Sequence, residues 1–180
     1  MNKHGANSID GLTIGNEVAD TPMNIMQEVW DVRGYLHNDV KYKGPVSTVH
    51  SWVHVMNNPV LCDADRVTVN AHAFYDGNFQ AWATSSFIKD VVLPNIKKAG
   101  AKYPAVNDII IAESGWPSRG PSNKVAVSSL ANEQAALSGL NCAANSSKII
   151  AFEATDSPRK GGSANEKSEC SSADLAVGCR

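Results

Sequence analysis

Five short apolar stretches alternate along this chain with longer segments whose apolar positions recur every three or four residues. A short apolar or β-branched run predicts a strand, and the three-to-four spacing predicts a helix that buries one face. Strands are expected near 12–16, 46–49, 66–70, 108–112 and 148–152, and helices near 22–37, 86–100 and 127–140. Pro94 should kink or split the second helix. The alternation favours an α/β fold with a parallel sheet.

The clearest strand is the run Ile109-Ile110-Ile111, which is followed by Glu113 and closed by Gly115 and Pro117. Consecutive β-branched residues are typical of a strand buried on both faces of a parallel sheet. Glu113 therefore stands at the carboxyl end of a central strand, where parallel α/β folds carry their chemistry. Its position alone also allows a simpler role, in which the side chain caps a turn.

A second predicted strand, Leu12-Thr13-Ile14, runs in the same way into Glu17. Glycoside hydrolysis needs two carboxyl groups, one that protonates the leaving oxygen and one that acts as nucleophile or base. Glu17 and Glu113 at two strand ends of one sheet are therefore a candidate catalytic pair. They lie far apart in the sequence, so only the fold can bring them together.

Two histidines, His50 and His54, flank Trp52 at a spacing that would present both rings to a metal on a helix. No carboxylate completes the usual zinc motif, and the flanking β-branched residues indicate a strand end rather than a helix. We therefore expect the histidines to be structural and no metal to be bound. Trp52 is either core or a platform on which a sugar ring stacks.

The composition narrows the class of protein. With 180 residues, 43% hydrophobic content and a net charge of −2, the chain can bury one core and has no basic surface for nucleic acid. No apolar run approaches the ~20 residues of a membrane span, and Met1–Ser8 shows no secretory signal. The four cysteines contain no Cys-x-x-Cys pair and allow three disulfide connectivities, so they leave the compartment open.

Five motifs in order resemble one known family. Two of them contain the glutamates, Ile14-Gly15-Asn16-Glu17 and Glu113-Ser114-Gly115-Trp116-Pro117-Ser118. The other three are Pro45-Val46-Ser47-Thr48-Val49-His50-Ser51-Trp52, Asn70-Ala71-His72-Ala73-Phe74-Tyr75-Asp76-Gly77 and Phe152-Glu153-Ala154-Thr155-Asp156. The chain is similar from about Leu12 to Lys160 to glycoside hydrolase family 17, the β-1,3-glucan hydrolases and transglycosylases, in its fungal cell-wall branch.

The resemblance implies a retaining reaction on β-1,3-glucan of the cell wall, without cofactor or metal. Glu17 would be the acid/base and Glu113 the nucleophile. The residues it implies for substrate binding are Asn16, which would contact the sugar 2-hydroxyl, with Trp52, His72, Tyr75, Trp116 and Glu153. Arg159 stands where the family has an aromatic residue, which puts one sugar-stacking or packing contact of the family in question. The family also implies a secreted or wall-bound protein, although this chain shows no signal peptide.

The family's (β/α)8 barrel has eight strands and typically ~250 residues, so the five strands predicted here correspond to about strands 4 to 8. We expect a partial barrel over residues 1–160 and an irregular tail over 161–180, and no activity for this chain by itself. A non-catalytic glucan-binding or wall-structural remnant is the alternative, and an unrelated α/β protein a third. The sequence leaves open the oligomeric state and the choice between hydrolysis and transglycosylation.

Overall fold

The computed structural model describes residues 8–145, 147–153, 162–165 and 167. The chain divides into two compact units, of which unit 1 comprises residues 1–69 and 95–110 and unit 2 comprises 70–94 and 111–180. Five strands are hydrogen-bonded in chain order: β1 (Leu12–Asn16), β2 (Val46–Ser51), β3 (Val67–Asn70), β4 (Ile109–Ser114) and β5 (Lys148–Ala151). The structure confirms the predicted α/β class and the five predicted strands. The boundary predicted at residues 160 and 161 lies outside the described residues.

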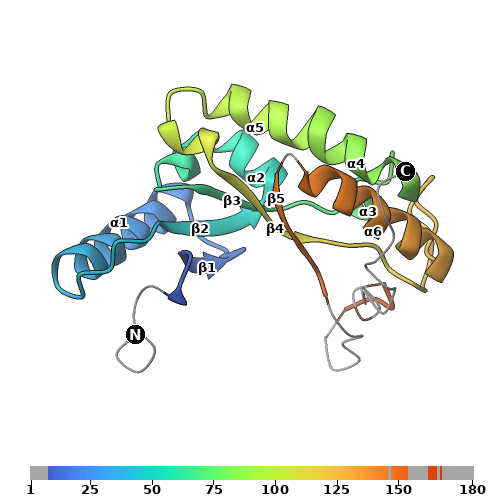
Figure 1. Ribbon diagram of the computed structural model, residues 1–180, viewed down its shortest axis with the longest axis horizontal. Coiled ribbons are helices and arrows are strands. Elements are labelled where there is room, and N and C mark those ends of the chain that lie inside the picture. Colours follow the sequence, from blue (N-terminus) through green and yellow to red (C-terminus); the bar gives the residue numbers. More distant parts are fainter. Residues whose placement is uncertain (1–7, 146, 154–161, 166, 168–180) are drawn as a thin grey trace. The chain divides into compact units, whose positions relative to one another are not determined.

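Unit 1 begins with β1, which pairs in parallel with β2 so that Leu12 lies opposite Val46. The helix α1 (Pro22–Asn38) connects the two strands and lies beside them within this unit (Figure 1). Thr21 caps α1 by accepting a hydrogen bond from the backbone N–H of Asn24, and Pro22 occupies the first turn, where its missing N–H costs nothing. The buried face of α1 carries Ile25, Met26, Val29 and Leu36.

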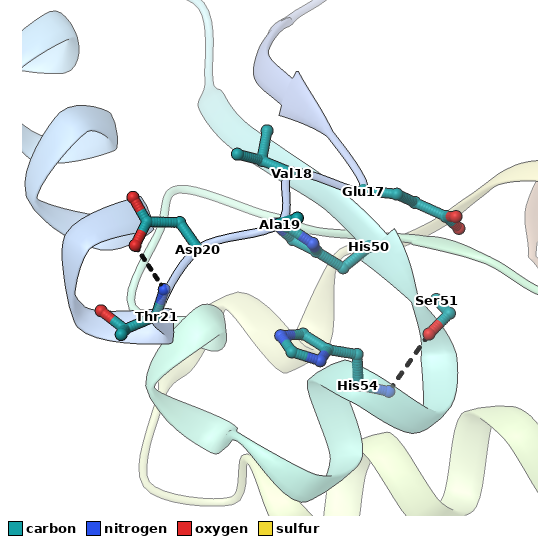
Figure 2. A pocket seen from close by; sticks show the side chains of 8 residues that line it. All are labelled: Glu17, Val18, Ala19, Asp20, Thr21, His50, Ser51 and His54. Atoms are coloured by element: carbon teal, nitrogen blue, oxygen red, sulfur yellow. Dashed lines mark hydrogen bonds between the residues drawn. The ribbon is translucent and has the colours of Figure 1, made fainter.

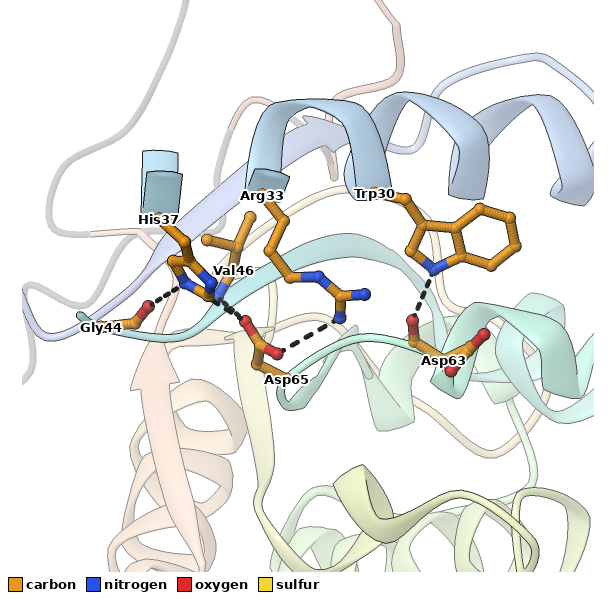
Figure 3. Close-up of polar contacts among 7 residues, drawn as sticks. All are labelled: Trp30, Arg33, His37, Gly44, Val46, Asp63 and Asp65. Carbon is orange, nitrogen blue, oxygen red and sulfur yellow. Dashed lines mark hydrogen bonds and ion pairs between the residues drawn. The ribbon is translucent and has the colours of Figure 1, made fainter. Parts of the chain in front are cut away.

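A polar contact network fastens α1 to the start of β2 and to the segment before β3 (Figure 3). The indole of Trp30 donates to the carbonyl of Asp63 at 3.0 Å, and Arg33 pairs with Asp65 at 3.3 Å. Asp65 also accepts a hydrogen bond from the backbone N–H of Val46 at 3.0 Å. Asp65 therefore fixes both the helix that follows Glu17 and the first residue of the strand beside β1.

The His50–His54 stretch differs from the prediction of a continuing strand end. The strand β2 ends at Ser51, and the short helix α2 (Trp52–Asn57) begins immediately after it. The reason is local, because the Ser51 hydroxyl accepts a hydrogen bond from the backbone N–H of His54 and thereby caps the helix. His50 consequently lies on a strand and His54 on a helix, so the two rings do not share a helix face.

Unit 2 contains the last residue of β3, most of β4, and β5. The helical region after β3 runs without a gap through α4 (Thr84–Ser86), a π-helical segment (Phe87–Val92) and α5 (Leu93–Ala99), whose residues from Asn95 onward belong to unit 1. Pro94 does not split the helix, and the irregularity near it is the π-helical segment that directly precedes α5. The last helix, α6 (Leu130–Ala144), begins three residues later than expected, because Ser129 caps it by accepting from the backbone N–H of Asn132. The core of this unit contains Phe74, Phe87, Ile111 and Trp116.

Candidate active site

Glu17 lies directly after β1 and is exposed. Its backbone φ is 50°, a left-handed conformation that is uncommon for a residue with a side chain, and its N–H donates to the carbonyl of Val49 at 2.8 Å. Gly15, two residues earlier, also has a positive φ, of 76°. Non-glycine residues held in this region cluster at functional sites, because the surrounding structure must hold them there. The turn therefore presents the Glu17 carboxylate at the carboxyl end of β1.

A cavity of about 540 Å³ opens beside Glu17, and we call it the Glu17 pocket (Figure 2). The segment between β1 and α1 forms one side, and the end of β2 with the start of α2 forms the other. It is lined by Glu17, Val18, Ala19, Asp20, Thr21, His50, Ser51 and His54. The pocket therefore combines carboxylate, hydroxyl and imidazole groups, which suit a ligand rich in hydroxyls.

His50 is the most buried polar group of this pocket, with 3% of its surface exposed. Its Nε2 lies 3.1 Å from the Thr48 hydroxyl, and its ring centre lies 5.3 Å from that of His54. Burial lowers the pKa of His50, and the neighbouring His54 lowers it further, whereas the charge of Glu17 acts in the opposite direction. His50 therefore stays neutral at neutral pH and places an uncharged ring within electrostatic reach of Glu17.

Glu113 lies near the carboxyl end of β4, in unit 2, and hydrogen bonds to the residues directly after β3 and β5 fix this end. The backbone N–H of Ala71 donates to the carbonyl of Glu113 at 2.9 Å, and the hydroxyl of Ser114 donates to the carbonyl of Ala71 at 2.7 Å. The backbone N–H of Phe152 donates to the carbonyl of Ser114 at 2.9 Å. The backbone that carries Glu113 is thus held on both sides.

The His72 side chain approaches the Glu113 carboxylate. Its Nε2 lies 3.9 Å from Oε2 of Glu113, a distance too long for a hydrogen bond, and the two side chains form an ion pair only when the imidazole is protonated. The His72 side chain is 12% exposed and that of Glu113 is 23% exposed. The ring of His72 meets Tyr75 edge-on at 5.6 Å and Phe152 edge-on at 6.4 Å. Packing therefore holds His72 against the carboxylate.

Gly115, directly after β4, is required by a close approach of two chain segments. A Cβ at this position would collide with the backbone carbonyl oxygen of Phe152. Since this contact is with backbone, which cannot rotate away like a side chain, only glycine fits. The segment that carries Glu153 is thereby brought directly alongside the end of β4, and Glu153 is half-buried there. The other residues of its motif, 154–156, and Arg159 lie outside the described residues.

Trp116 lies in the core, which corrects the expectation that it binds substrate. It is 1% exposed, its indole donates to the carbonyl of Val127 at 2.9 Å, and its ring meets Phe74 edge-on at 5.2 Å. The remaining expected binding residues stay accessible to different degrees: Tyr75 is 45% exposed, Asn16 is exposed, and Trp52 is half-buried at the start of α2.

Three further observations bear on the predicted class of protein. Among the described residues, no group of three or more His, Cys, Asp or Glu side chains could hold a metal ion. Cys142 is disulfide-bonded and Cys62 is a buried free thiol, whereas Cys170 and Cys179 lie outside the described residues. No helix in the described part of the chain has the length and apolar character needed to cross a membrane.

Sequence reasoning did not assign His50, Asp20 or Thr21 to the site, although all three line the Glu17 pocket. A usable signal was present, because β1 and β2 are consecutive parallel strands and their carboxyl ends must be neighbours. The residue at the end of β2 therefore lies next to the residue after β1.

Comparison with known proteins finds similarity to glycoside hydrolases and to fungal cell-surface proteins. The sequence model of a family described as the BtgE/BtgC glycoside hydrolase domain matches residues 1–170. The chain is 39% identical over 144 residues to the cell surface mannoprotein MP65 of Candida albicans, and the aligned region covers 77% of this chain and 37% of that protein. It is 34% identical over 148 residues to the probable family 17 glucosidase SCW4 of Saccharomyces cerevisiae, covering 78% and 37%. The chain therefore spans little more than a third of the length of these relatives.

A solved structure shares the fold. The glycoside hydrolase family 17 β-1,3-glucanosyltransferase from Rhizomucor miehei aligns with a TM-score of 0.77 and 22% identity, covering 94% of this chain and 61% of that protein. An active-site mutant of the same enzyme in complex with laminaritriose aligns equally well, with a TM-score of 0.77. The two alignments show that the five-stranded sheet and its helices have the architecture of part of such a protein.

Proposed function

Since the chain belongs to the BtgE/BtgC glycoside hydrolase domain family, we propose that it carries both catalytic carboxylates of a retaining β-1,3-glucan hydrolase or transglycosylase. The observation that carries the proposal is the position of Glu17 and Glu113, each at the carboxyl end of a strand of one sheet. Carboxyl groups at strand ends are where (β/α)8 enzymes perform their chemistry. The substrate class is supported by the solved relative, which was crystallised with laminaritriose.

In the proposed first step, Glu17 donates a proton to the glycosidic oxygen while Glu113 attacks the anomeric carbon. The glycosidic bond breaks and a glycosyl ester of Glu113 forms. Glu17 then removes a proton from water or from a sugar hydroxyl, which attacks the ester and releases Glu113. A retaining mechanism requires the two carboxyl groups to lie about 5–5.5 Å apart in the working enzyme. No cofactor takes part in these steps.

We assign roles to the neighbouring groups from their positions beside the two glutamates and from the family resemblance. His72, 3.9 Å from Glu113 and packed against Tyr75, positions the nucleophile. Asn16, next to Glu17, binds the sugar 2-hydroxyl, and the exposed Tyr75, the half-buried Trp52 and Glu153 bind the sugar chain. The Glu17 pocket supplies hydroxyl-binding groups beside the acid/base.

We place the protein at the cell surface or in the cell wall, outside the cytosol. This placement is supported by the similarity to a cell surface mannoprotein and by the disulfide of Cys142, since disulfides persist in oxidising compartments.

The test uses the complete protein, and compares wild type with Glu17→Gln and Glu113→Gln on laminarin-type oligosaccharides. Glu28→Gln, an exposed glutamate of α1, is the matched control. Both catalytic variants should lose at least ~10²–10⁴-fold in kcat because each removes an acid/base or a nucleophile, and the control should not change. Full turnover by Glu113→Gln would refute the assignment. Binding of laminarin without turnover by wild type would favour the non-catalytic alternative.

A further inference from the structure

The connection between α6 and β5 consists of only three residues, Asn145-Ser146-Ser147, because α6 ends at Ala144 and β5 begins at Lys148. These three residues form an Asn-x-Ser sequence, and the middle residue is not proline. This is the acceptor sequence for N-linked glycosylation. Among the sixteen asparagines of the full sequence, Asn145 alone is followed two positions later by a serine or threonine.

The structure places this acceptor where a large modification fits. Asn145 is exposed and lies just beyond the last residue of α6, with its backbone N–H donating to Ala143. Its surroundings within unit 2 are open as well, since Asn141, Ala144 and Lys148 are exposed. The amide that would be modified and the hydroxyl of Ser147 that helps to activate it are thus both outside the regular helix and strand. Among the described residues around Asn145, the side chains of Asn141, Ala144 and Lys148 are exposed and leave room for a glycan.

An independent observation points to the compartment in which this modification occurs. Cys142, three residues before Asn145, is disulfide-bonded. Disulfides form in oxidising compartments such as the lumen of the endoplasmic reticulum, where the oligosaccharide transferase also acts. We propose that Asn145 is a site of N-linked glycosylation.

In the modification, the side-chain Nδ2 of Asn145 forms a bond to the anomeric carbon of an oligosaccharide. The donor is a lipid-linked diphospho-oligosaccharide, whose sugar–phosphate bond breaks at the same carbon. The lipid diphosphate leaves with the electron pair of that bond, and the amide nitrogen loses one proton to a base of the transferase. No oxidant or reductant is needed.

The glycan would be attached away from the residues assigned to substrate. Asn145 precedes β5, whereas Glu153 follows it, and the four residues of β5 separate the two by about 13 Å. The sugar chain would therefore extend from the amino end of the strand and leave its carboxyl end free. Removal of the glycan should not change turnover, so this proposal and the proposed function can fail separately.

The test is made on the complete protein secreted by a fungal host. Peptide mass spectrometry before and after peptide N-glycosidase treatment should find Asn145 glycosylated and converted to aspartate by the enzyme. Asn145→Gln and Ser147→Ala should abolish the modification and increase gel mobility, while Ser147→Thr should retain it. The matched control is Asn38→Gln, because Asn38 is an exposed asparagine at the end of α1 with no hydroxyl residue two positions later.

An unmodified Asn145 in secreted protein whose Cys142 is disulfide-bonded would overturn the proposal. An unmodified Asn145 in secreted protein whose Cys142 is reduced would overturn it as well, because the protein would still have passed through the compartment in which the transferase acts. Activity of Asn145→Gln on laminarin-type oligosaccharides should equal that of wild type.

Discussion

Replacement of Trp116 by alanine should destabilise the protein without acting on substrate recognition. The indole is 1% exposed, and an aromatic side chain of this size buries roughly 200 Å², worth about 5 kcal/mol at about 25 cal/mol per Å². Large-to-small substitutions of buried aromatic residues typically cost about 3–5 kcal/mol, so we expect a loss in this range. Trp116→Phe keeps the edge-on contact with Phe74 and should lose only about 1–2 kcal/mol. The carbonyl of Val127 remains bonded, because Asn132 also donates to it at 2.8 Å.

The assay is equilibrium unfolding of the complete protein in denaturant, followed by circular dichroism, together with KM for laminarin-type oligosaccharides. The midpoint should fall strongly for Trp116→Ala and slightly for Trp116→Phe, and KM should be unchanged in the phenylalanine variant. A KM raised at least tenfold in both variants, with unfolding midpoints equal to that of wild type, would refute the core role and restore the substrate-binding role.

Two further predictions follow from the geometry around the glutamates. Gly115→Ala should destabilise the protein by about 1–3 kcal/mol in the same unfolding assay, because the added Cβ meets the Phe152 carbonyl. The control is Gly34→Ala, where a Cβ meets no atom within 4 Å, and this variant should be neutral or slightly stabilising. Equal effects of the two substitutions would contradict the steric reasoning. Burial lowers the pKa of His50 from its ordinary value of 6.5, so the unfolded state binds more protons than the folded state as the pH falls below about 6.5. The free energy of unfolding therefore decreases as the pH decreases. His50→Asn should lower the slope of stability against pH between about pH 7 and 5, and an unchanged slope would show that His50 does not titrate as described.

The strands were predictable because their signals are local. Three consecutive isoleucines at 109–111 can hardly be placed anywhere but in a buried strand, and β4 is found at Ile109–Ser114. The irregularity of the helix before Pro94 was predictable for the same reason, since a proline ring clashes with the carbonyl four residues earlier, here Asp90 inside the π-helical segment. The ends of elements were less predictable, because Ser51 and Ser129 decide them through single capping hydrogen bonds.

The burial of Trp116 was not predictable from its neighbours in sequence. Its place in the core depends on Phe74 and Val127, which lie on other segments and become its neighbours only in the fold. Proximity to Glu113 in the sequence says nothing about the direction in which the indole points. The Glu17 pocket has the same origin, since His50 and His54 approach the end of β1 only through the pairing of β1 with β2.

The assignment of the two glutamates is tested most directly by azide rescue of the complete protein with an activated β-laminaribioside, followed by nuclear magnetic resonance of the product. In Glu113→Ala, azide should replace the nucleophile and attack once, giving the α-glycosyl azide. In Glu17→Ala, azide should instead attack the glycosyl ester on Glu113, giving the β-glycosyl azide after two inversions. Interchanged anomers would reverse the two roles, and absence of rescue by both variants would contradict the proposed catalytic pair.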